Sequence, residues 1–281
     1  STAAEILYTS QPGVSKQIRL LEEELDVQIF TRSGKQLTHI TPAGKKILVI
    51  AESILQAAQN MKAVAAEFKD QSKGSLNIAT TRTQARYALP SVIKAFRETY
   101  PDVSLHIHQG SPAQIAELVT SGEVDMAIST EDPKLFAELI SMPCYDWNRC
   151  ALIPRNHPLA QLTTVTLADI AAYPLVTYVF AWSDASPIQK AFNIAGLTPN
   201  IAFSATDADV IKEYVRLGLG VGLVAHMAYV PEQDGDLIAI PLDHLFDWST
   251  TYICIRPHII LRGYMYDFMG RFAPHLTKEL I

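Results

Sequence analysis

The chain has 281 residues, which is more than one domain of ordinary size. Its 23 basic and 29 acidic side chains give a formal net charge of −6, which argues against a protein that coats nucleic acid through bulk charge. The three cysteines are few, odd in number and without metal-ligand spacing, so we expect reduced thiols in the cytoplasm rather than a disulfide framework.

The first 35 residues predict two helices joined by a tight turn and followed by a hairpin. The first helix is short and places Ala4, Leu7 and Tyr8 inward. Ser10 suits the N-cap of the second helix, and Pro12 falls in its first turn, where helices accept proline. Apolar residues then recur at steps of four, three and four, as on one helix face. They are Val14, Ile18, Leu21 and Leu25. The arrangement is that of a helix-turn-helix.

Polar and basic side chains occupy another face of the second helix, near its N-terminal end. That end of a recognition helix enters the major groove of DNA. The predicted DNA contacts of the helix are Gln11, Pro12, Ser15, Lys16 and Arg19. Arg32 and Lys35 flank the Ser-Gly tip of the hairpin, where basic side chains suit phosphate contacts. Ordinary surface helices share the helical pattern, so the flanking turn and basic hairpin are what favour DNA binding.

A long helix is predicted from Pro42 to about Lys69. Its apolar residues are spaced four and three apart for three heptads, as in a coiled-coil seam. The predicted seam consists of Ile47, Ala51, Ile54, Ala58, Met61, Ala65 and Phe68. Packing on its own domain is the alternative, but dimerisation is favoured because a single exposed helix has little else to cover its stripe. Gly74 ends the segment and is a candidate hinge.

Beyond residue 74 the pattern alternates between short apolar strands and amphipathic helices. This alternation predicts parallel sheets with right-handed crossovers, arranged as two doubly wound α/β units. Three predicted strands lead to five hydroxyl or amide side chains at the place where such sheets bind ligands. These are Thr81, Thr83, Gln84, Thr130 and Ser183. They suit an anion, although helix N-caps would look the same.

Several motifs resemble the LysR-type transcriptional regulators. They are SQPGVSKQIRLLEEEL, the following F-x-R, and LTxxTPAG. Further stretches resemble the family's cysteine-regulon branch: TTRTQARYALP, HQGSPAQIA, ATDADVIKEYVRLGLGVG and YMYDFMGRFAPHLT. The resemblance covers essentially the whole chain. The family also has a first helix that should precede Ser1, and the resemblance leads us to expect a C-terminal tail after the last residue.

The resemblance implies a domain plan and a fold. A winged helix-turn-helix and a long linker helix should precede a periplasmic-binding-protein-like α/β effector region with a cleft between two subdomains. The expected boundaries are 1–41 for the DNA-binding domain, 42–73 for the linker helix and 74–281 for the effector region, with subdomain I at about 74–144 and 247–281 and subdomain II at about 145–246.

The resemblance also assigns effector-binding roles. Thr81, Thr83, Gln84 and Ser183 match effector-binding positions of the branch, and Ser183 stands where the branch usually has threonine. Thr130 and Trp147 match residues near the same cleft. We expect no Lys or Arg buried in this cleft. Arg82 lies within the loop and could either favour an anion or face solvent.

Enzyme and metal functions are not favoured. The Gly-rich stretch at residues 218–222 follows a helix and opens a strand, which is the wrong order for a dinucleotide loop. No catalytic Ser-His-Asp pattern is evident. His106 and His108 share one face of a strand without a third metal ligand. Asp207 and Asp209 open a helix and are interpreted as cap and dipole partners. No apolar run approaches the roughly 18 residues of a membrane span, and no signal peptide is visible.

These observations lead to one functional prediction. The chain should be a cytoplasmic, ligand-responsive DNA-binding regulator, mainly an activator, of sulfur assimilation and cysteine biosynthesis. No cofactor is expected, and the effector should be O- or N-acetylserine, sulfate or a related small anion. Expected partners are promoter DNA, RNA polymerase and further copies of the chain as a dimer or tetramer. The alternatives are a LysR-type regulator of another pathway or a sulfate-binding solute receptor.

Overall fold

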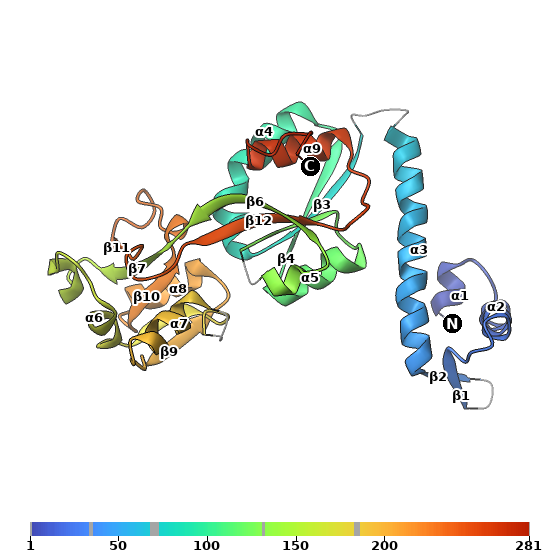
Figure 1. Ribbon diagram of the computed structural model, residues 1–281, viewed down its shortest axis with the longest axis horizontal. Helices are drawn as coiled ribbons and strands as arrows, with labels where there is room; N and C mark the ends of the chain where they lie inside the picture. The colour runs from blue at the N-terminus through green and yellow to red at the C-terminus, as the bar shows by residue number, and fades with distance from the viewer. Residues whose placement is uncertain (1, 34–35, 68–72, 131–132, 183–185, 281) are drawn as a thin grey trace. The chain divides into compact units, whose positions relative to one another are not determined.

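The computed structural model describes residues 2–33, 36–67, 73–130, 133–182 and 186–280. The chain divides into two compact units, Ser1–Lys62 and Ala63–Ile281 (Figure 1). Each unit is described by itself.

The first unit begins with the predicted pair of helices, α1 (Thr2–Ile6) and α2 (Gln11–Glu24). Ser10 caps α2, because its Oγ accepts a hydrogen bond from Gly13 N at 3.3 Å. The inward placement of Leu7 and Tyr8 was wrong. Helix α1 ends before them, and Tyr8 adopts a positive φ of 49° in the turn with 98% of its surface exposed.

A hairpin and a long helix complete this unit. Strand β1 (Phe30–Ser33) pairs antiparallel with β2 (Gln36–Ile40), and α3 follows over Pro42–Glu67. Thr41 joins them: its Oγ1 donates to Gln28 O at 2.6 Å and accepts from Gly44 N at 2.9 Å. A Cβ on Gly44 would lie only 2.2 Å from Ile29 O, so the TPAG motif needs glycine to let the helix approach the hairpin.

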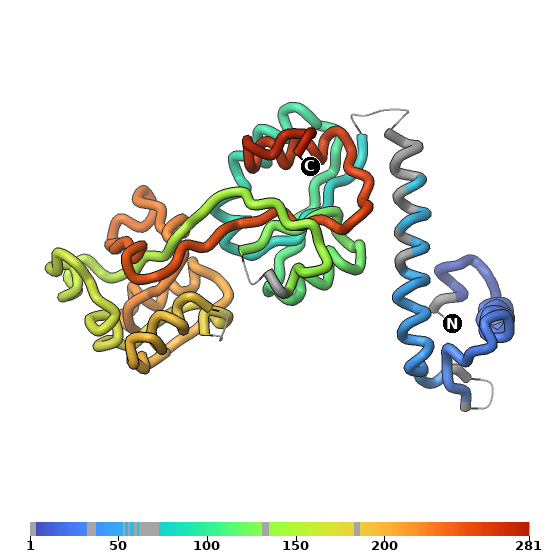
Figure 2. Tube along the Cα trace, in the orientation of Figure 1, coloured from blue at the N-terminus to red at the C-terminus, as the bar shows by residue number. Residues whose placement is uncertain are grey.

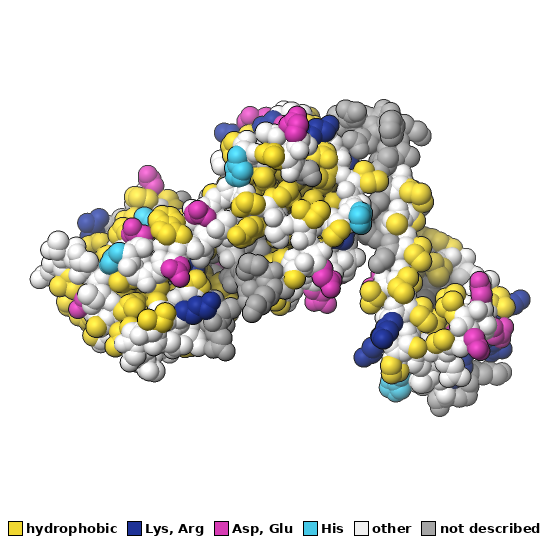
Figure 3. All heavy atoms as spheres, viewed as in Figure 1, with side chains coloured by type: hydrophobic (Ala, Val, Ile, Leu, Met, Phe, Trp, Pro, Cys, Tyr) yellow, Lys and Arg dark blue, Asp and Glu magenta, His cyan; other side chains and the backbone are white. Residues whose placement is uncertain are grey.

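All predicted seam residues except Phe68 lie on α3, where hydrophobic side chains are exposed (Figure 3). Ile54 and Met61 are 64% and 68% exposed, whereas Ile47, Ala51 and Ala58 are half-buried. The side chain of Ala65 and all of Phe68 lie outside the described residues. The exposed stripe is apolar surface that a partner helix could cover.

The second unit has two lobes, each built on a five-stranded sheet. In lobe I the strand order is β4-β3-β5-β12-β6. Its strands are β3 (Gly74–Thr80), β4 (Val103–Gln109), β5 (Met126–Ser129), β6 (Ile140–Trp147) and β12 (Ser249–Ile255). Its helices are η1 (a π-helix, Gln84–Ala88), α4 (Leu89–Thr99), α5 (Pro112–Ser121), η2 (Pro133–Phe136) and α9 (Gly263–Phe272).

Alternation along β3 explains why helices cover both faces of this sheet. Leu76 and Ile78 pack into a core with Phe96 of α4 and Phe268 of α9. Ala79 faces the other way, into a smaller core under α5. Figure 1 shows α4 and α9 on one side of the sheet and α5 on the other. A central strand that is buried on both faces therefore fixes the position of its own carboxyl end.

Lobe II repeats the plan with the strand order β11-β7-β10-β8-β9. Its strands are β7 (Arg149–Pro154), β8 (Leu175–Tyr178), β9 (Ile201–Ala205), β10 (Val221–Ala225) and β11 (Leu237–Pro241). Its helices are η3 (Pro158–Gln161), α6 (Leu167–Ala171), α7 (Pro187–Ile194), α8 (Ala208–Arg216) and η4 (His226–Ala228). One continuous core runs through the lobe, with Phe192, Ile211 and Leu223 fully buried.

The chain crosses between the lobes twice, from β6 into β7 and from β11 into β12 (Figure 2). Both sheets are mixed rather than purely parallel, because the crossing strands β12 and β7 run antiparallel to their neighbours. Strand β6 is not apparent from the sequence pattern. Strand β6 contains Pro143, which lacks an N–H donor. The sheet accommodates this proline because β6 is an edge strand.

The structure also bears on the predicted hinge at Gly74 and on the predicted reduced cysteines. Gly74 is not a free hinge, because it lies within β3, pairs with Val103 and packs against the hydroxyl of Tyr264. Cys144, Cys150 and Cys254 are all buried and free.

Candidate effector site

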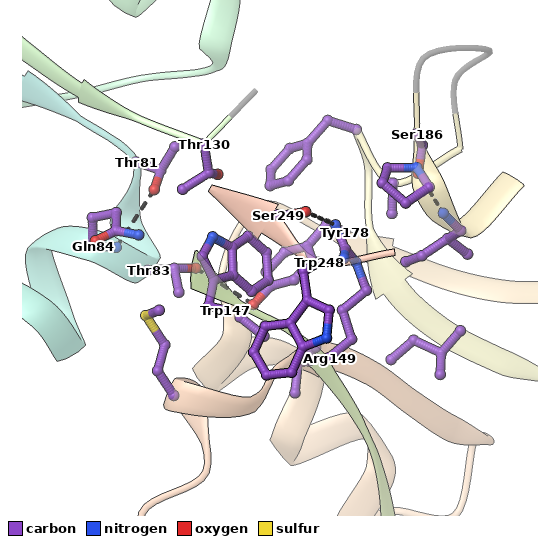
Figure 4. A pocket seen from close by; sticks show the side chains of 18 of the residues that line it. Thr81, Thr83, Gln84, Thr130, Trp147, Arg149, Tyr178, Ser186, Trp248 and Ser249 are labelled. Atoms are coloured by element: carbon purple, nitrogen blue, oxygen red, sulfur yellow. Dashed lines mark hydrogen bonds between the residues drawn. The ribbon is translucent and has the colours of Figure 1, made fainter. Parts of the chain in front are cut away.

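A cavity of about 270 Å³ lies between the two lobes. Figure 4 shows Thr81, Thr83 and Gln84 on one side and Arg149, Tyr178 and Ser186 on the other, with Trp147 and Trp248 between them. Five of the six predicted effector residues line it: Thr81, Thr83, Gln84, Thr130 and Trp147. The sixth, Ser183, lies outside the described residues.

Lobe I contributes hydroxyls and an amide from the segment that follows β3. Gln84 is only 1% exposed, and its side chain is held at both ends. Tyr145 Oη donates to its Oε1 at 2.5 Å, and its Nε2 donates to Thr251 Oγ1 at 3.3 Å. An amide nitrogen carries two N–H donors, so Gln84 can hold Thr251 and still donate to a ligand.

Thr83 connects the two sides of the cavity. Its Oγ1 donates to the hydroxyl of Tyr178, at the end of β8, at 3.4 Å. Burial raises the pKa of Tyr178 to about 12, so its hydroxyl stays protonated. A neutral hydroxyl can donate to an anion.

Arg149 corrects the expectation of a cleft without a buried cation. It is 9% exposed, and of the described residues that line the cavity it alone is charged. Its Nη2 donates to Ser249 Oγ at 2.9 Å, and its guanidinium lies 4.8 Å from the ring centroid of Trp147. These contacts fix the guanidinium at the cavity wall, where its charge favours an anion.

The indole of Trp147 carries a donor without a partner. Its Nε1 is buried and makes no hydrogen bond to the described residues. An unsatisfied buried donor is unfavourable by about 1–3 kcal/mol. A ligand with an acceptor atom would satisfy it, so this atom points to a ligand in the cavity.

Three lining residues were not predicted from the sequence, and they differ in whether a sequence rule could have identified them. Tyr178 ends a buried strand, so the rule that ligands bind at the carboxyl ends of strands could have found it. Trp248 precedes the start of β12, an antiparallel strand to which that rule does not apply. Arg149 starts β7 immediately after the first crossing, and only the fold brings it to the cavity.

Arg82 neither enters the cavity wall nor simply faces solvent. Its Nη1 lies 3.3 Å from Asp207 Oδ2 of lobe II, although the side chain of Arg82 remains 56% exposed. Asp207 also caps α8 as predicted, accepting from Asp209 N at 2.9 Å.

The predicted DNA-contacting residues lie on α2 and the hairpin of the first unit. Gln11, Pro12, Lys16 and Arg19 are exposed, and Ser15 is half-buried. Glu22 is buried rather than solvated, because its carboxylate accepts from Ile29 N and Phe30 N at 2.9 Å each. It also pairs with Arg32 Nη2 at 2.6 Å. Lys35 lies outside the described residues.

Two family descriptions match the chain, one within each unit. The bacterial regulatory helix-turn-helix proteins of the lysR family match residues 1–45, and the LysR substrate binding domain matches residues 69–276. The chain belongs to the LysR family of bacterial transcriptional regulators.

Individual LysR-type relatives agree with this membership. The HTH-type transcriptional regulator CysB of Haemophilus influenzae is 56% identical over 99% of this chain and 86% of its own length. The HTH-type transcriptional regulator cbl of Escherichia coli is 45% identical over 98% of this chain and 87% of its own. The crystal structure of the cofactor-binding domain of the Cbl transcriptional regulator superposes with a TM-score of 0.70 at 42% identity, covering 74% of this chain and 91% of that one.

Two predicted exclusions can be set beside these findings. The relatives are named as transcriptional regulators, so the chain is a DNA-binding regulator and not an enzyme. Within the part of the chain that the structure describes, no helix is both long enough and apolar enough to span a membrane.

Proposed function

We propose that this chain is a cytoplasmic regulator, mainly an activator, of genes for sulfur assimilation and cysteine biosynthesis, and that it responds to a small anion. The sequence identity of 56% to a CysB regulator and of 45% to a cbl regulator supports the choice of pathway. The cavity supports the choice of ligand: hydroxyls, an amide and one guanidinium line it, and no carboxylate occurs among its described lining residues.

The single observation that carries the effector proposal most directly is the buried Nε1 of Trp147, which has no hydrogen-bond partner among the described residues. Trp147 lines the same cavity as Thr83, Gln84 and Arg149, and an acceptor atom that reached the indole N–H would remove the cost of leaving this donor unsatisfied. The proposed effectors are O-acetylserine, N-acetylserine, sulfate, thiosulfate and adenosine phosphosulfate, and Ser183 is proposed to contribute a further hydroxyl.

Calorimetric titration of these five compounds into the protein tests the ligand. One of them should bind, and Thr83→Val should weaken that binding while the exposed control Thr163→Val should not. If none binds, the proposed effectors are incorrect. If one binds and both variants bind it equally well, the proposed site is incorrect.

The exposed side of α2 supports promoter reading by Gln11 and Arg19, with Lys16 on phosphates. Lys35, which lies outside the described residues, is proposed to contact phosphate as well. The ion pair of Arg32 with Glu22 gives Arg32 a second role, since it holds the hairpin as well as facing the backbone of DNA. Arg19→Ala should lose about 1–3 kcal/mol of discrimination between operator and non-operator DNA. Unchanged affinity and sequence preference in a gel-shift assay would contradict this role.

We further propose that α3 forms a dimer through its predicted seam and that dimers associate into a tetramer that acts on RNA polymerase. A dimer presents two winged domains to two half-sites. Ile54→Asp places two charges in an apolar seam, so light scattering should report a smaller assembly. An unchanged mass would show that other surfaces hold the oligomer.

A further inference from the structure

A second set of contacts joins the lobes outside the cavity. It runs from the segment 82–87 of lobe I, which also carries Thr83 and Gln84, to the start of α8 in lobe II. Tyr87 Oη donates to Asp209 Oδ1 at 2.6 Å, and Arg86 Nε lies 3.3 Å from Asp209 Oδ2. Asp209 therefore receives two bonds from lobe I.

On the lobe II side, Asp209 is anchored to a buried charge. Lys212 Nζ lies 3.0 Å from Asp209 Oδ1, 3.0 Å from Asp234 Oδ2 and 3.1 Å from Ala228 O. The side chains of Lys212 and Asp234 are each only 3% exposed. Burial alone would raise the pKa of Asp209, but hydrogen bonds from Tyr87 and Lys212 and the nearby charges lower it, so it is ionised at neutral pH.

On the lobe I side, the contacts end on η1. This π-helix holds Gln84 against the cavity and Tyr87 against Asp209 within five residues. Single π-turns are uncommon and occur often at functional sites. Because the element is short and hydrogen-bonded, a displacement of Tyr87 also displaces Gln84 and the adjacent Thr83.

We propose that Asp209 is a positioning residue for the effector. By holding Tyr87 and Arg86 it fixes η1, and thereby Thr83 and Gln84, in the geometry that binds the ligand between the lobes. Asp209 does not itself line the cavity. The inference rests on the proposed effector site. A ligand that binds both lobes would in turn favour the arrangement in which these contacts form.

Tyr87→Phe is the sharpest test, because it removes one hydroxyl and keeps the ring that lies 5.3 Å from Lys212 Nζ. Tyr229→Phe is the matched control, since its hydroxyl meets Leu237 O within lobe II at 3.5 Å. Hydrogen exchange of the ligand-free protein should be faster at residues 84–88 in Tyr87→Phe and unchanged in the control. Unchanged exchange there overturns the proposal, whatever the ligand affinity.

Affinity gives the second readout. For N-acetylserine and sulfate as probes, Tyr87→Phe should bind about tenfold more weakly than wild type, as expected for a lost hydrogen bond to a charged group. Asp209→Asn should bind more weakly still, because it also loses the charge that attracts Arg86. Faster exchange with unchanged affinity for a probe that the wild type binds would overturn the proposal.

The two readouts separate this inference from the proposed function. If the wild type binds neither probe, the assignment of these effectors fails, and the exchange measurement alone decides whether Asp209 positions η1.

Discussion

The two lobes share one sheet plan but present different chemistry to the cavity. In each, one strand runs parallel to both of its neighbours, and beyond them lie a strand of opposite direction and an edge strand that pairs antiparallel with it. Strand β3 of lobe I leads to Thr81 and Thr83 and then to Gln84, the first residue of the π-helix η1. Strand β8 of lobe II ends in Tyr178 and leads to Phe180. The shared frame sets where a ligand can lie, and the segments after the strands set what it can be.

The lobes also differ in how they use buried charge. Lobe II holds Lys212 and Asp234 as a buried pair, whereas Arg262 and Asp125 of lobe I are 14% and 13% exposed and their charged atoms lie 3.7 Å apart. Asp234→Asn should therefore destabilise the protein by about 3 kcal/mol, because it leaves Lys212 with less compensation. Denaturant unfolding measures this difference. The control Asp236→Asn removes a largely exposed partner of Arg216 and should cost less than about 1 kcal/mol. Equal losses would contradict the claim that the buried Lys212–Asp234 pair stabilises lobe II more than an exposed pair does.

The same pair predicts a pH dependence. Burial would raise the pKa of Asp234, but hydrogen bonds from Val230 N, Lys212 and Arg216 lower it below its usual value. A carboxyl whose pKa is lowered by folding stabilises the folded protein fully at pH values above its unfolded-state pKa of about 3.9. This stabilisation is lost as the pH falls through the lower, folded-state pKa. The difference in unfolding free energy between wild type and Asp234→Asn should therefore shrink below about pH 4. A difference that stays constant from pH 7 to pH 3 would contradict this assignment.

The contribution of lobe II to binding can be tested at Arg149. Arg149→Gln removes the charge from the cavity wall, so sulfate and acylated serine should bind roughly 10- to 100-fold more weakly. Arg155→Gln is a suitable control, since Arg155 is exposed and donates to Gly235 O at 2.6 Å away from the cavity. Calorimetry compares the two. Equal affinities would mean that the charge of Arg149 does not contribute to anion binding.

The contribution of lobe I can be divided between two residues. Gln84→Ala loses contacts with Tyr145 and Thr251 as well as with a ligand, so it should lower both stability, by about 1–3 kcal/mol, and affinity. Thr83→Val removes a single hydroxyl that faces the cavity, so it should lower the affinity for the effector by about tenfold and change the free energy of unfolding little. Thermal unfolding measures the stability of the two variants, and calorimetry measures their affinity. If both variants lost the same stability and the same affinity, Gln84 would have no structural role beyond that of Thr83.

Local patterns in the sequence were sufficient for many elements but not for the assembly. The cap at Ser10, the helix after Pro42 and the strand before Thr81 follow from side-chain spacing and turn chemistry. Strand β6 was missed because Pro143 suggests a break, and only its edge position in the sheet permits it. Local spacing also gave no indication that Leu7 would lie in a turn.

The candidate site shows the same limit. Residues at the ends of parallel strands could be predicted, because the carboxyl ends of such strands gather at one edge of a sheet. Arg149 and Asp209 could not, since each acquires its role from contacts between segments about 100 or more residues apart. Buried Glu22 is a smaller case of the same kind, because the hairpin that covers it lies beyond its own helix.

The response of transcription to effector tests the central claim most directly. In a purified transcription assay with promoter DNA, wild-type protein should respond to the compound that calorimetry identifies, and Thr163→Val should respond in the same way. Thr83→Val should bind the promoter normally but require about tenfold more of the compound for the same response. A Thr83→Val protein that responds at the wild-type concentration would contradict the claim that the cavity between the lobes is the effector site.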